Sequence, residues 1–281
     1  MTTWAHHAMT LHILDHLEQG SDDWLDARRG MVTASVIGQL ITTGPPSAHT
    51  VDCPTCKVEQ GPCISIARKE PTLLKTVHST RSDAAALLPP VVKPADTDYS
   101  RALTLTLAAE RITGWTEHVY VTAAMERGNM DEPLARDLYS QTWEPVREVG
   151  FMVRDDWGFS IGHSPDGLVG DDGLIEVKSR APKKHLATIL ADEVPPENMA
   201  QIQCGLLVSG RSWCDYLSYC GGMPMWRKRV HPDPMWFGAI IAAVANFEAA
   251  VADITNTYRE AVVGLPATER IDYSIPLGLE F

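Results

Sequence analysis

Long hydrophobic runs are absent from this sequence. No uninterrupted stretch reaches the roughly 18 to 20 apolar residues that a membrane-spanning helix needs, so no membrane span is expected. Residues 1–10 lack a basic segment followed by an apolar one, so no secretory signal is expected. Without an export signal, the six cysteines should be reduced thiols or metal ligands rather than disulfides, and we expect a cytoplasmic protein.

Positive charge is scarce. The chain has 24 Lys and Arg against 36 Asp and Glu, which gives a formal net charge of −12. This balance argues against broad, non-specific binding to nucleic-acid backbones, because such binding depends on Lys and Arg contacts to phosphate. It still permits an enzyme with a small basic track and an acidic metal site, since bound cations offset carboxylates locally. No internal repeat is visible, and the length allows one large domain or two small ones.

The most informative stretch of the sequence is residues 162–180. A Gly-Asp-Asp-Gly turn at 170–173 lies between two apolar runs and predicts a β-hairpin. On the second strand, Glu176 and Lys178 are two residues apart and therefore share a face. Asp166, on the other side of the hairpin, can converge with them.

This grouping has a chemical logic. Two carboxylates on rigid strands form a hard-oxygen site suited to Mg²⁺ or Mn²⁺. Such ions activate a water, neutralise a phosphate oxygen and stabilise a leaving alkoxide. The lysine beside them would hold or polarise the attacking water. The plainer interpretation is a surface hairpin with an ordinary Glu–Lys face, and this stretch alone favours neither.

An anion pocket is one interpretation of the N-terminal region. Residues 21–29 predict a helix with Ser21 as its N-cap, and a short second helix is expected to follow with Thr33 or Ser35 as its cap. Arg28 and the Ser35 hydroxyl, beside that second N-terminus, would favour phosphate. Routine helix packing is the alternative and is favoured when these residues are taken alone.

Residues 44–98 break the pattern of the flanking segments. They are rich in Pro, Ser, Thr and Asp and resemble an insertion. Within them, Cys53, Cys56, Cys63 and His78 supply four ligands for a tetrahedral structural Zn²⁺. A module with so small a core would need a metal to fold. The alternative is three unconnected thiols in a loop.

The remaining chain alternates predicted helices and strands. Helices are expected at 99–112, 123–142, 182–190, 196–209 and 234–262, and strands at 146–153, 158–163, 213–220 and 225–231. The first two strands and the hairpin are expected to form an antiparallel sheet of at least three strands. On the 196–209 helix, Gln201 and Gln203 are about 200° apart, so only one can face the metal site.

Four blocks of the sequence, in order, resemble the lambda exonuclease and YqaJ recombinase family of the PD-(D/E)xK nucleases. They are residues 28–35, residues 128–136 around Glu132, residues 164–167 with 176–178, and residues 199–203. The resemblance runs from residue 18 to about residue 235 around the cysteine-bearing insertion.

The resemblance implies an α/β (α+β) fold, with a restriction-endonuclease-like core in which helices flank a central mixed β-sheet. Residues 1–43 would be the N-terminal helical part of the nuclease core. Residues 44–98 would be an inserted zinc-knuckle-like segment, and residues 99–281 the rest of the core.

The resemblance also implies a catalytic unit. Asp166 and Glu176 would bind Mg²⁺ or Mn²⁺, two ions per site, with the Val177 carbonyl as a backbone ligand. Glu132 would add a third carboxylate from its helix. Lys178 would orient the nucleophilic water.

A second set of matching residues would contact DNA. Arg28, Ser35 and Gln201 match positions that hold the terminal 5′-phosphate, and Ser164 would contact that phosphate or a metal-bound water. Weaker DNA contacts are expected from Lys183, Lys184 and Gln203.

The implied activity is degradation of one strand of linear double-stranded DNA from its 5′ end. The products would be mononucleotides and 3′ overhangs for phage recombination. The implied partners are DNA ends, a single-strand annealing protein and further copies of the chain in a trimeric ring.

Two other functions remain open from the sequence. One is a structure-specific or single-strand nuclease of the Cas4-like, iron–sulfur type, for which Cys204, Cys214 and Cys220 would be the downstream cluster ligands. A colourless protein would exclude it. The other is a zinc-dependent DNA- or protein-binding module with an inactive nuclease core, which metal-dependent hydrolysis of duplex DNA would exclude.

Overall fold

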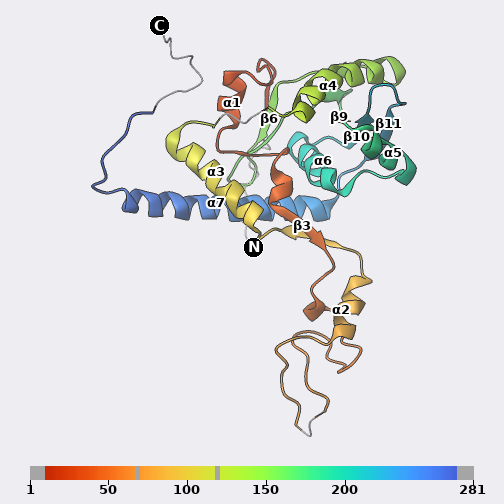
Figure 1. The fold of residues 1–281 in the computed structure, drawn as a ribbon, viewed down its shortest axis with the longest axis vertical. Helices are drawn as coiled ribbons and strands as arrows, with labels where there is room; N and C mark the ends of the chain where they lie inside the picture. Colours follow the sequence, from red (N-terminus) through yellow and green to blue (C-terminus); the bar gives the residue numbers. More distant parts are fainter. Residues whose placement is uncertain (1–9, 68–69, 118–120, 271–281) are drawn as a thin grey trace, which may run out of the picture.

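A computed structural model describes residues 10–67, 70–117 and 121–270. In these ranges two β-sheets form the centre of the molecule, helices cover them, and a two-stranded ribbon leads to a lobe that extends away from the core (Figure 1). The predicted mixed α/β architecture, with a central mixed sheet flanked by helices, is confirmed.

The helices and strands have the following bounds. The helices are α1 (Asp22–Arg28), α2 (Ser79–Ala86), α3 (Asp98–Thr113), α4 (Ala123–Thr142), α5 (Pro182–Ala191), α6 (Pro196–Ser209) and α7 (Pro234–Ala261), with short 3-10 turns η1 (Ile37–Gln39) and η2 (Ala48–Thr50). The strands are β1 (Leu11–Leu14), β2 (Val32–Thr33), β3 (Ile41–Gly44), β4 (Val91–Pro94), β5 (Val146–Arg147), β6 (Phe151–Arg154), β7 (Ile161–His163), β8 (Gly167–Val169), β9 (Gly173–Ser179), β10 (Trp213–Tyr219) and β11 (Trp226–Val230).

The larger sheet contains the predicted hairpin. Its order is β11-β10-β9-β8-β5, and β10 runs parallel to β9 while the other pairs are antiparallel. Gly167 pairs with Ile175 across the hairpin, so Asp166 lies level with Glu176. The hairpin prediction is confirmed, and β9 is flanked by a strand on each side.

The predicted pairing of the preceding strands with this hairpin is confirmed only for β5, which pairs antiparallel with β8. It is wrong for β6 and β7, which pair with each other in the smaller sheet, whose order is β1-β6-β7-β2. The chain crosses from one sheet to the other at Ser164-Pro165-Asp166, between β7 and β8. Proline has no N–H to donate to a strand ladder, so it suits such a crossing point.

The N-terminal region agrees with the sequence only in its first helix. Ser21 is the N-cap of α1 and its hydroxyl accepts a bond from the Trp24 amide. The expected second helix is only the turn η1, whose N-cap is Val36. Thr33 lies in β2 and Ser35 caps no helix. Val32 and Thr33 pair with β7 in the smaller sheet and so do not form a helix.

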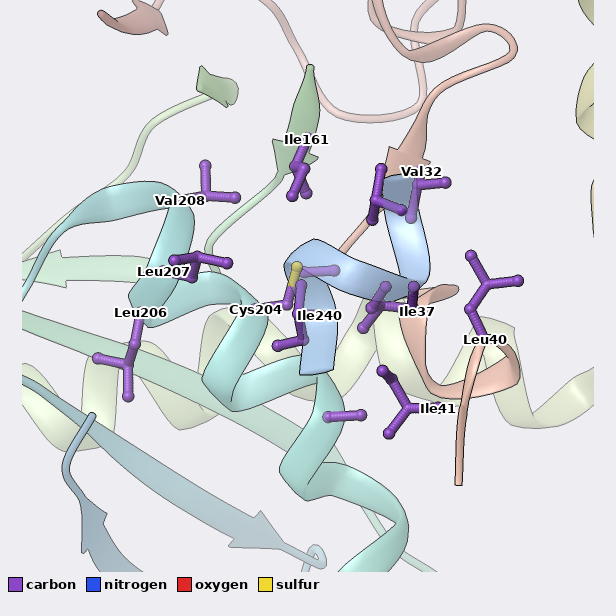
Figure 2. Close-up of a cluster of buried hydrophobic side chains, with 14 of the residues drawn as sticks. Val32, Ile37, Leu40, Ile41, Ile161, Cys204, Leu206, Leu207, Val208 and Ile240 are labelled. Atoms are coloured by element: carbon purple, nitrogen blue, oxygen red, sulfur yellow. The ribbon is translucent and has the colours of Figure 1, made fainter. Parts of the chain in front are cut away.

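One buried cluster joins α6 and α7 to the N-terminal segment. Figure 2 shows Cys204 and Leu207 of α6 close to Ile240 of α7 and Ile37 of η1. These side chains are at most 6% exposed. Each Å² of apolar surface removed from water stabilises the fold by about 25 cal/mol. Burial of such a cluster is therefore a large favourable term in the free energy of folding. The cluster fixes α6, which carries Gln201.

Helix α7 is long and apolar enough to cross a membrane by length and composition alone. The core helix of a soluble protein passes the same test. Here Ile240, Val244 and Phe247 are buried in the cluster just described, and α7 packs against α3, α6 and β4.

A buried acid ties α4 to the larger sheet. Asp215 on β10 has no exposed surface, and it accepts bonds from Tyr139 of α4 at 2.7 Å and from Arg229 of β11 at 2.8 Å. Burial raises the pKa of Asp215, but these partners bring it below its ordinary value. The ionised carboxylate therefore holds α4 and β11 against the same strand.

The lobe between β3 and β4 spans residues 45–90 and stands clear of the core (Figure 1). The ribbon at its base is antiparallel, and Ile41 pairs with Pro94. α7 packs on β4. Inside the lobe, the turn η2, helix α2 and an antiparallel bridge between Ile64 and Leu73 surround the cysteines.

Gly205 lets α6 approach β7 closely. A Cβ added at Gly205 would lie 2.8 Å from Nε2 of His163, whose side chain is 3% exposed. His163 immediately precedes the segment that carries Asp166. The absence of a side chain at Gly205 therefore helps to set the position of that segment.

We predict that Gly205→Ala lowers the free energy of unfolding by about 1–3 kcal/mol, since the added methyl overpacks a buried ring. The matched control is Gly238→Ala in α7, where an added Cβ meets nothing within 4 Å. It should raise stability by about 0.5–1 kcal/mol through helix propensity. Denaturant titration followed by circular dichroism measures both. Equal effects of the two substitutions would contradict this packing.

Candidate functional site

A cleft of about 330 Å³ opens between α1, α4, β7, β9 and α6. Most of the residues predicted for catalysis and DNA contact line it. They are Arg28, Ser35, Glu132, Ser164, Asp166, Val177, Lys178 and Gln201. Segments separated by more than 150 residues in the sequence thus meet in one depression.

Asp166 and Lys178 line the cleft, whereas Glu176 beside them is buried and is not among the lining residues. The Val177 N–H donates to Oδ2 of Asp166 at 2.6 Å, which fixes this carboxylate against β9. Glu176 is 2% exposed, and its Oε1 lies 2.5 Å from Nζ of Lys178.

The environment shifts the protonation of these groups. Burial, and then the charges of Glu176 and Glu132, raise the pKa of Asp166 well above its ordinary value. Burial alone would lower the pKa of Lys178, but Glu176 and Asp166 raise it above its ordinary value. The lysine is therefore cationic, and the cleft concentrates negative charge beside it.

Arg136 holds the third carboxylate in place. Its guanidinium donates to Oε1 of Glu132 at 2.6 Å and to the Asp166 carbonyl at 2.8 Å. It also pairs with Glu148 at 2.6 Å. Burial raises the pKa of Glu132 above its ordinary value, and the charge of Arg136 offsets only part of this shift. One side chain thus links α4 to the segment before β8.

These residues fit a divalent cation. Among the described residues, the carboxylates of Glu132, Asp166 and Glu176 have two cationic partners, Lys178 and Arg136, and Arg136 is also paired with Glu148. Burial, and then the charges of the other two carboxylates, raise the pKa of Asp166. Carboxylate oxygens are the ligands that Mg²⁺ and Mn²⁺ prefer.

Neutral donors and one arginine line the other end of the cleft. Nη2 of Arg28 donates to the hydroxyls of Thr33 at 3.2 Å and Ser35 at 3.1 Å. The guanidinium stacks 4.1 Å from the ring of Trp24, whose Nε1 donates to Ser164 Oγ at 2.9 Å. Because Ser35 caps no helix, an anion here would be held by side chains rather than by a helix N-terminus.

The two glutamines of α6 are distinguished by the structure. Gln201 lines the cleft. Gln203 is 1% exposed, its Nε2 donates to the His231 carbonyl at 2.9 Å, and its Oε1 accepts from the Asp233 amide at 2.9 Å. Gln203 anchors the segment before α7, so its expected DNA contact is wrong.

Lys183 and Lys184 lie on the exposed first turn of α5, outside the residues that line the cleft. Their position leaves them available to solvent. A contact with DNA beyond the cleft stays a prediction for both.

The sequence argument missed several residues of the site. Trp24 is one turn before Arg28 on α1, a spacing that predicts a shared face. Arg136 is likewise one turn after Glu132. Thr33 was considered only as a helix cap. His163 also lines the cleft, and burial and the charge of Lys178 lower its pKa to about 3, so it is neutral.

The lobe brings its three cysteines and one histidine together. Sγ of Cys53 lies 3.6 Å from Sγ of Cys63 and 3.4 Å from Nδ1 of His78. With Cys56 included, all four ligand atoms lie within 4.8 Å of one another. The sulfurs are far beyond the bonding distance of a disulfide, about 2.05 Å. A tetrahedral zinc separates its ligands by roughly 3.5–3.8 Å, so the cluster is compatible with zinc.

The three downstream cysteines do not resemble an iron–sulfur ligand set. Cys204, Cys214 and Cys220 are all buried, and Cys204 lies in the apolar cluster of Figure 2. Burial raises the pKa of the Cys204 thiol to about 12. Across the described ranges, only the four residues of the lobe form a metal-ligand group of this kind. The structure therefore argues against the Cas4-like alternative.

Comparison with known proteins agrees with this geometry. A search of curated proteins finds no significant match. Among solved structures, an alkaline exonuclease from Laribacter hongkongensis, LHK-Exo, is similar with a TM-score of 0.60 and 27% identity, over 88% of this chain and 100% of that chain. The same enzyme in complex with dAMP is similar with a TM-score of 0.59, 27% identity and the same coverage.

The YqaJ-like viral recombinase domain matches residues 23–212. This match spans α1, the inserted lobe, the carboxylate hairpin and α6. It covers well over half of the 281 residues, and the chain therefore belongs to the family of YqaJ-like viral recombinase domains.

Proposed function

We propose that this chain is a metal-dependent 5′-to-3′ exonuclease that acts on the ends of linear double-stranded DNA. It releases mononucleotides and leaves 3′ overhangs that serve phage recombination. The observation that carries the proposal is the cleft itself, which is lined both by the carboxylates of Asp166 and Glu132 and by the donors Arg28, Ser35 and Gln201.

The comparisons support the nuclease part of this proposal. The family and the similar alkaline exonuclease make the chain a DNA exonuclease. That relative was also solved in complex with dAMP, a deoxynucleoside monophosphate. A cleft of about 330 Å³ has the size for a nucleotide of this class, which fits a product released one unit at a time.

The acidic group would do the chemistry. Asp166, Glu176 and Glu132, with the Val177 carbonyl, would hold two Mg²⁺ or Mn²⁺ ions. When bound, these ions supply Lewis acidity that offsets phosphate charge and favours deprotonation of water. The Lys178 ammonium holds the attacking water and steadies the charge that builds on the phosphate oxygens. Arg136 keeps the carboxylates in register.

The opposite end of the cleft would select the strand end. Arg28 offers a planar fork that matches phosphate oxygens, and Ser35, Ser164 and Gln201 add neutral donors. A terminal phosphate carries more charge than an internal diester. The pocket therefore prefers a 5′-phosphorylated end and places the first internucleotide bond at the acidic group.

The remaining parts of the proposal concern organisation. Residues 44–98, which contain the lobe, are proposed to be an inserted module in which Cys53, Cys56, Cys63 and His78 hold one structural Zn²⁺. Residues 1–43 and 99–281 would form one nuclease core. The enzyme would act in the cytoplasm, as a closed homo-oligomer and with a single-strand annealing protein. Light scattering of the purified protein tests the oligomer.

Removal of either hairpin carboxylate should abolish cleavage. In Asp166→Asn and Glu176→Gln, loss of a carboxylate should weaken binding of Mg²⁺ by calorimetry while duplex binding partly persists. Lys178→Met should lose at least about a hundred-fold in rate, within the usual contribution of an acid–base group, and still bind the ion. Substantial hydrolysis by Asp166→Asn would exclude this site.

Arg28 should matter most on phosphorylated ends. The wild type should digest 5′-phosphorylated duplex faster than 5′-hydroxyl duplex. Loss of one charge-assisted contact costs about 1.5–3 kcal/mol, so Arg28→Ala should slow the phosphorylated substrate roughly ten- to a hundred-fold. The hydroxyl substrate should slow much less.

The control for Arg28→Ala is Arg101→Ala, which removes an arginine on α3 outside the cleft. It should leave both rates unchanged. Equal wild-type rates on the two ends, measured as initial rates with excess enzyme, would refute the role given to Arg28, Ser35 and Gln201.

A further inference from the structure

A fully buried arginine lies at the centre of the lobe. Arg81 of α2 has no exposed surface. Its Nε donates to the Val51 carbonyl at 2.5 Å, and its Nη1 donates to the Gly61 carbonyl at 2.7 Å. Its Nη2 donates to the carbonyls of His49 at 3.4 Å and Glu59 at 3.1 Å. Arg81 therefore ties together the loops on both sides of the cysteines.

These carbonyls satisfy the donors of Arg81 but do not cancel its charge. A guanidinium stays protonated in proteins, and a buried cation without a counter-charge is costly. Within the described ranges, each side-chain hydrogen bond of Arg81 goes to a carbonyl or to sulfur. The sulfur is Sγ of Cys63, 3.5 Å from Nη1. The counter-charge must therefore come from the cysteine cluster.

Backbone amides point to the same conclusion. The His78 N–H donates to Sγ of Cys63 at 3.4 Å, and the Cys56 N–H donates to Sγ of Cys53 at 3.5 Å. Amide N–H donors and a nearby guanidinium are typical neighbours of side chains that bind a metal. The four potential ligand atoms also lie within 4.8 Å of one another. The cluster therefore has the geometry of a metal site whose sulfurs accept hydrogen bonds from the surrounding lobe.

We propose that Arg81 is the charge-balancing residue of the zinc centre, a positioning residue that acts through Cys63. Three thiolates, a neutral imidazole and one Zn²⁺ carry a single net negative charge, which the guanidinium cancels. This inference rests on the zinc site proposed above. This role explains why the guanidinium of Arg81 is buried at the centre of a lobe with few apolar side chains. It also means that the metal and the arginine stabilise the lobe together.

Two substitutions separate charge from shape. Arg81→Met removes the charge and the donors, whereas Arg81→Lys keeps the charge with a shorter reach. In full-length protein, elemental analysis should find about one zinc per chain in the wild type. Competition with a chromogenic chelator should show that Arg81→Met binds zinc about 10–100-fold more weakly, as is typical for loss of an outer-shell partner. Arg81→Lys should recover part of this loss.

The absorption spectrum of a bound metal gives a second measurement, which a change in loop packing alone would leave unchanged. In the Co²⁺-substituted protein, the sulfur-to-metal charge-transfer band should shift in Arg81→Met, because Cys63 loses a donor to its sulfur. Arg101→Met, an exposed arginine of α3, is the control and should match the wild type in affinity and spectrum.

Three results would overturn the inference. Wild-type protein that binds no zinc would remove the metal centre itself. Unchanged zinc affinity in Arg81→Met would make Arg81 a loop-packing residue. Equal loss in Arg81→Lys and Arg81→Met would show that shape, not charge, is what the site requires. DNA digestion by the same samples reports on the nuclease core separately, so failure of the proposed exonuclease would remain distinguishable.

Discussion

The structure depends on like charges that are held together away from water. Asp166, directly before β8, lies level with Glu176 on β9, and Glu132 approaches them from α4. Without partners, these groups would move apart. The Val177 amide, Lys178 and Arg136 hold them in place, and β8 and β10 flank β9 on both sides. Such preorganised electrostatics is the main source of rate enhancement in many hydrolases.

The rest of the fold serves to bring a second group of residues to this acidic group. α1 carries Trp24 and Arg28, β2 carries Thr33, and α6 carries Gln201. These elements are joined through the cluster of Figure 2, in which Ile37, Cys204 and Ile240 pack together. In the proposed exonuclease, the acidic group and the donors around Arg28 would together fix the direction in which a DNA strand enters the cleft.

The lobe differs from the core in the side chains at its centre. The core is held by buried apolar side chains, whereas residues 45–90 surround thiols, a histidine and a buried arginine. The ribbon of β3 and β4 at its base packs on α7. The core is stabilised by apolar burial, whereas the lobe, on the zinc site proposed here, would be stabilised by a metal and by charge.

Much of this arrangement could be predicted from local patterns in the sequence. The hairpin was predictable because its turn residues and its alternation of polar and apolar residues are local. Helix α4 was predictable because its helical pattern of apolar residues is long. The meeting of Cys53, Cys56, Cys63 and His78 in one cluster was predictable from residue type and spacing. The sequence did not predict that β6 and β7 lie in a different sheet from the hairpin, since sheet membership depends on partners far away in the chain. The helix expected after Ser35 does not form for the same reason, because pairing of β2 with β7 overrides local preference.

Side-chain partners at the site were harder to foresee. Arg136 and Trp24 have the right spacing, but helix spacing is shared by many residues that only pack. Gln201 and Gln203 could not be separated until the direction of α6 was known. His163 owes its place to a glycine on another element, Gly205, and no local signal records that contact.

The most direct test follows the two ends of one strand. A linear duplex is labelled on the same strand either at its 5′ phosphate or at its 3′ nucleotide and is incubated with the enzyme and Mg²⁺. We predict that the 5′ label appears first, as a mononucleotide, and that chelation of Mg²⁺ stops its release. Earlier release of the 3′ label, or unchanged hydrolysis with the ion chelated, would contradict the account.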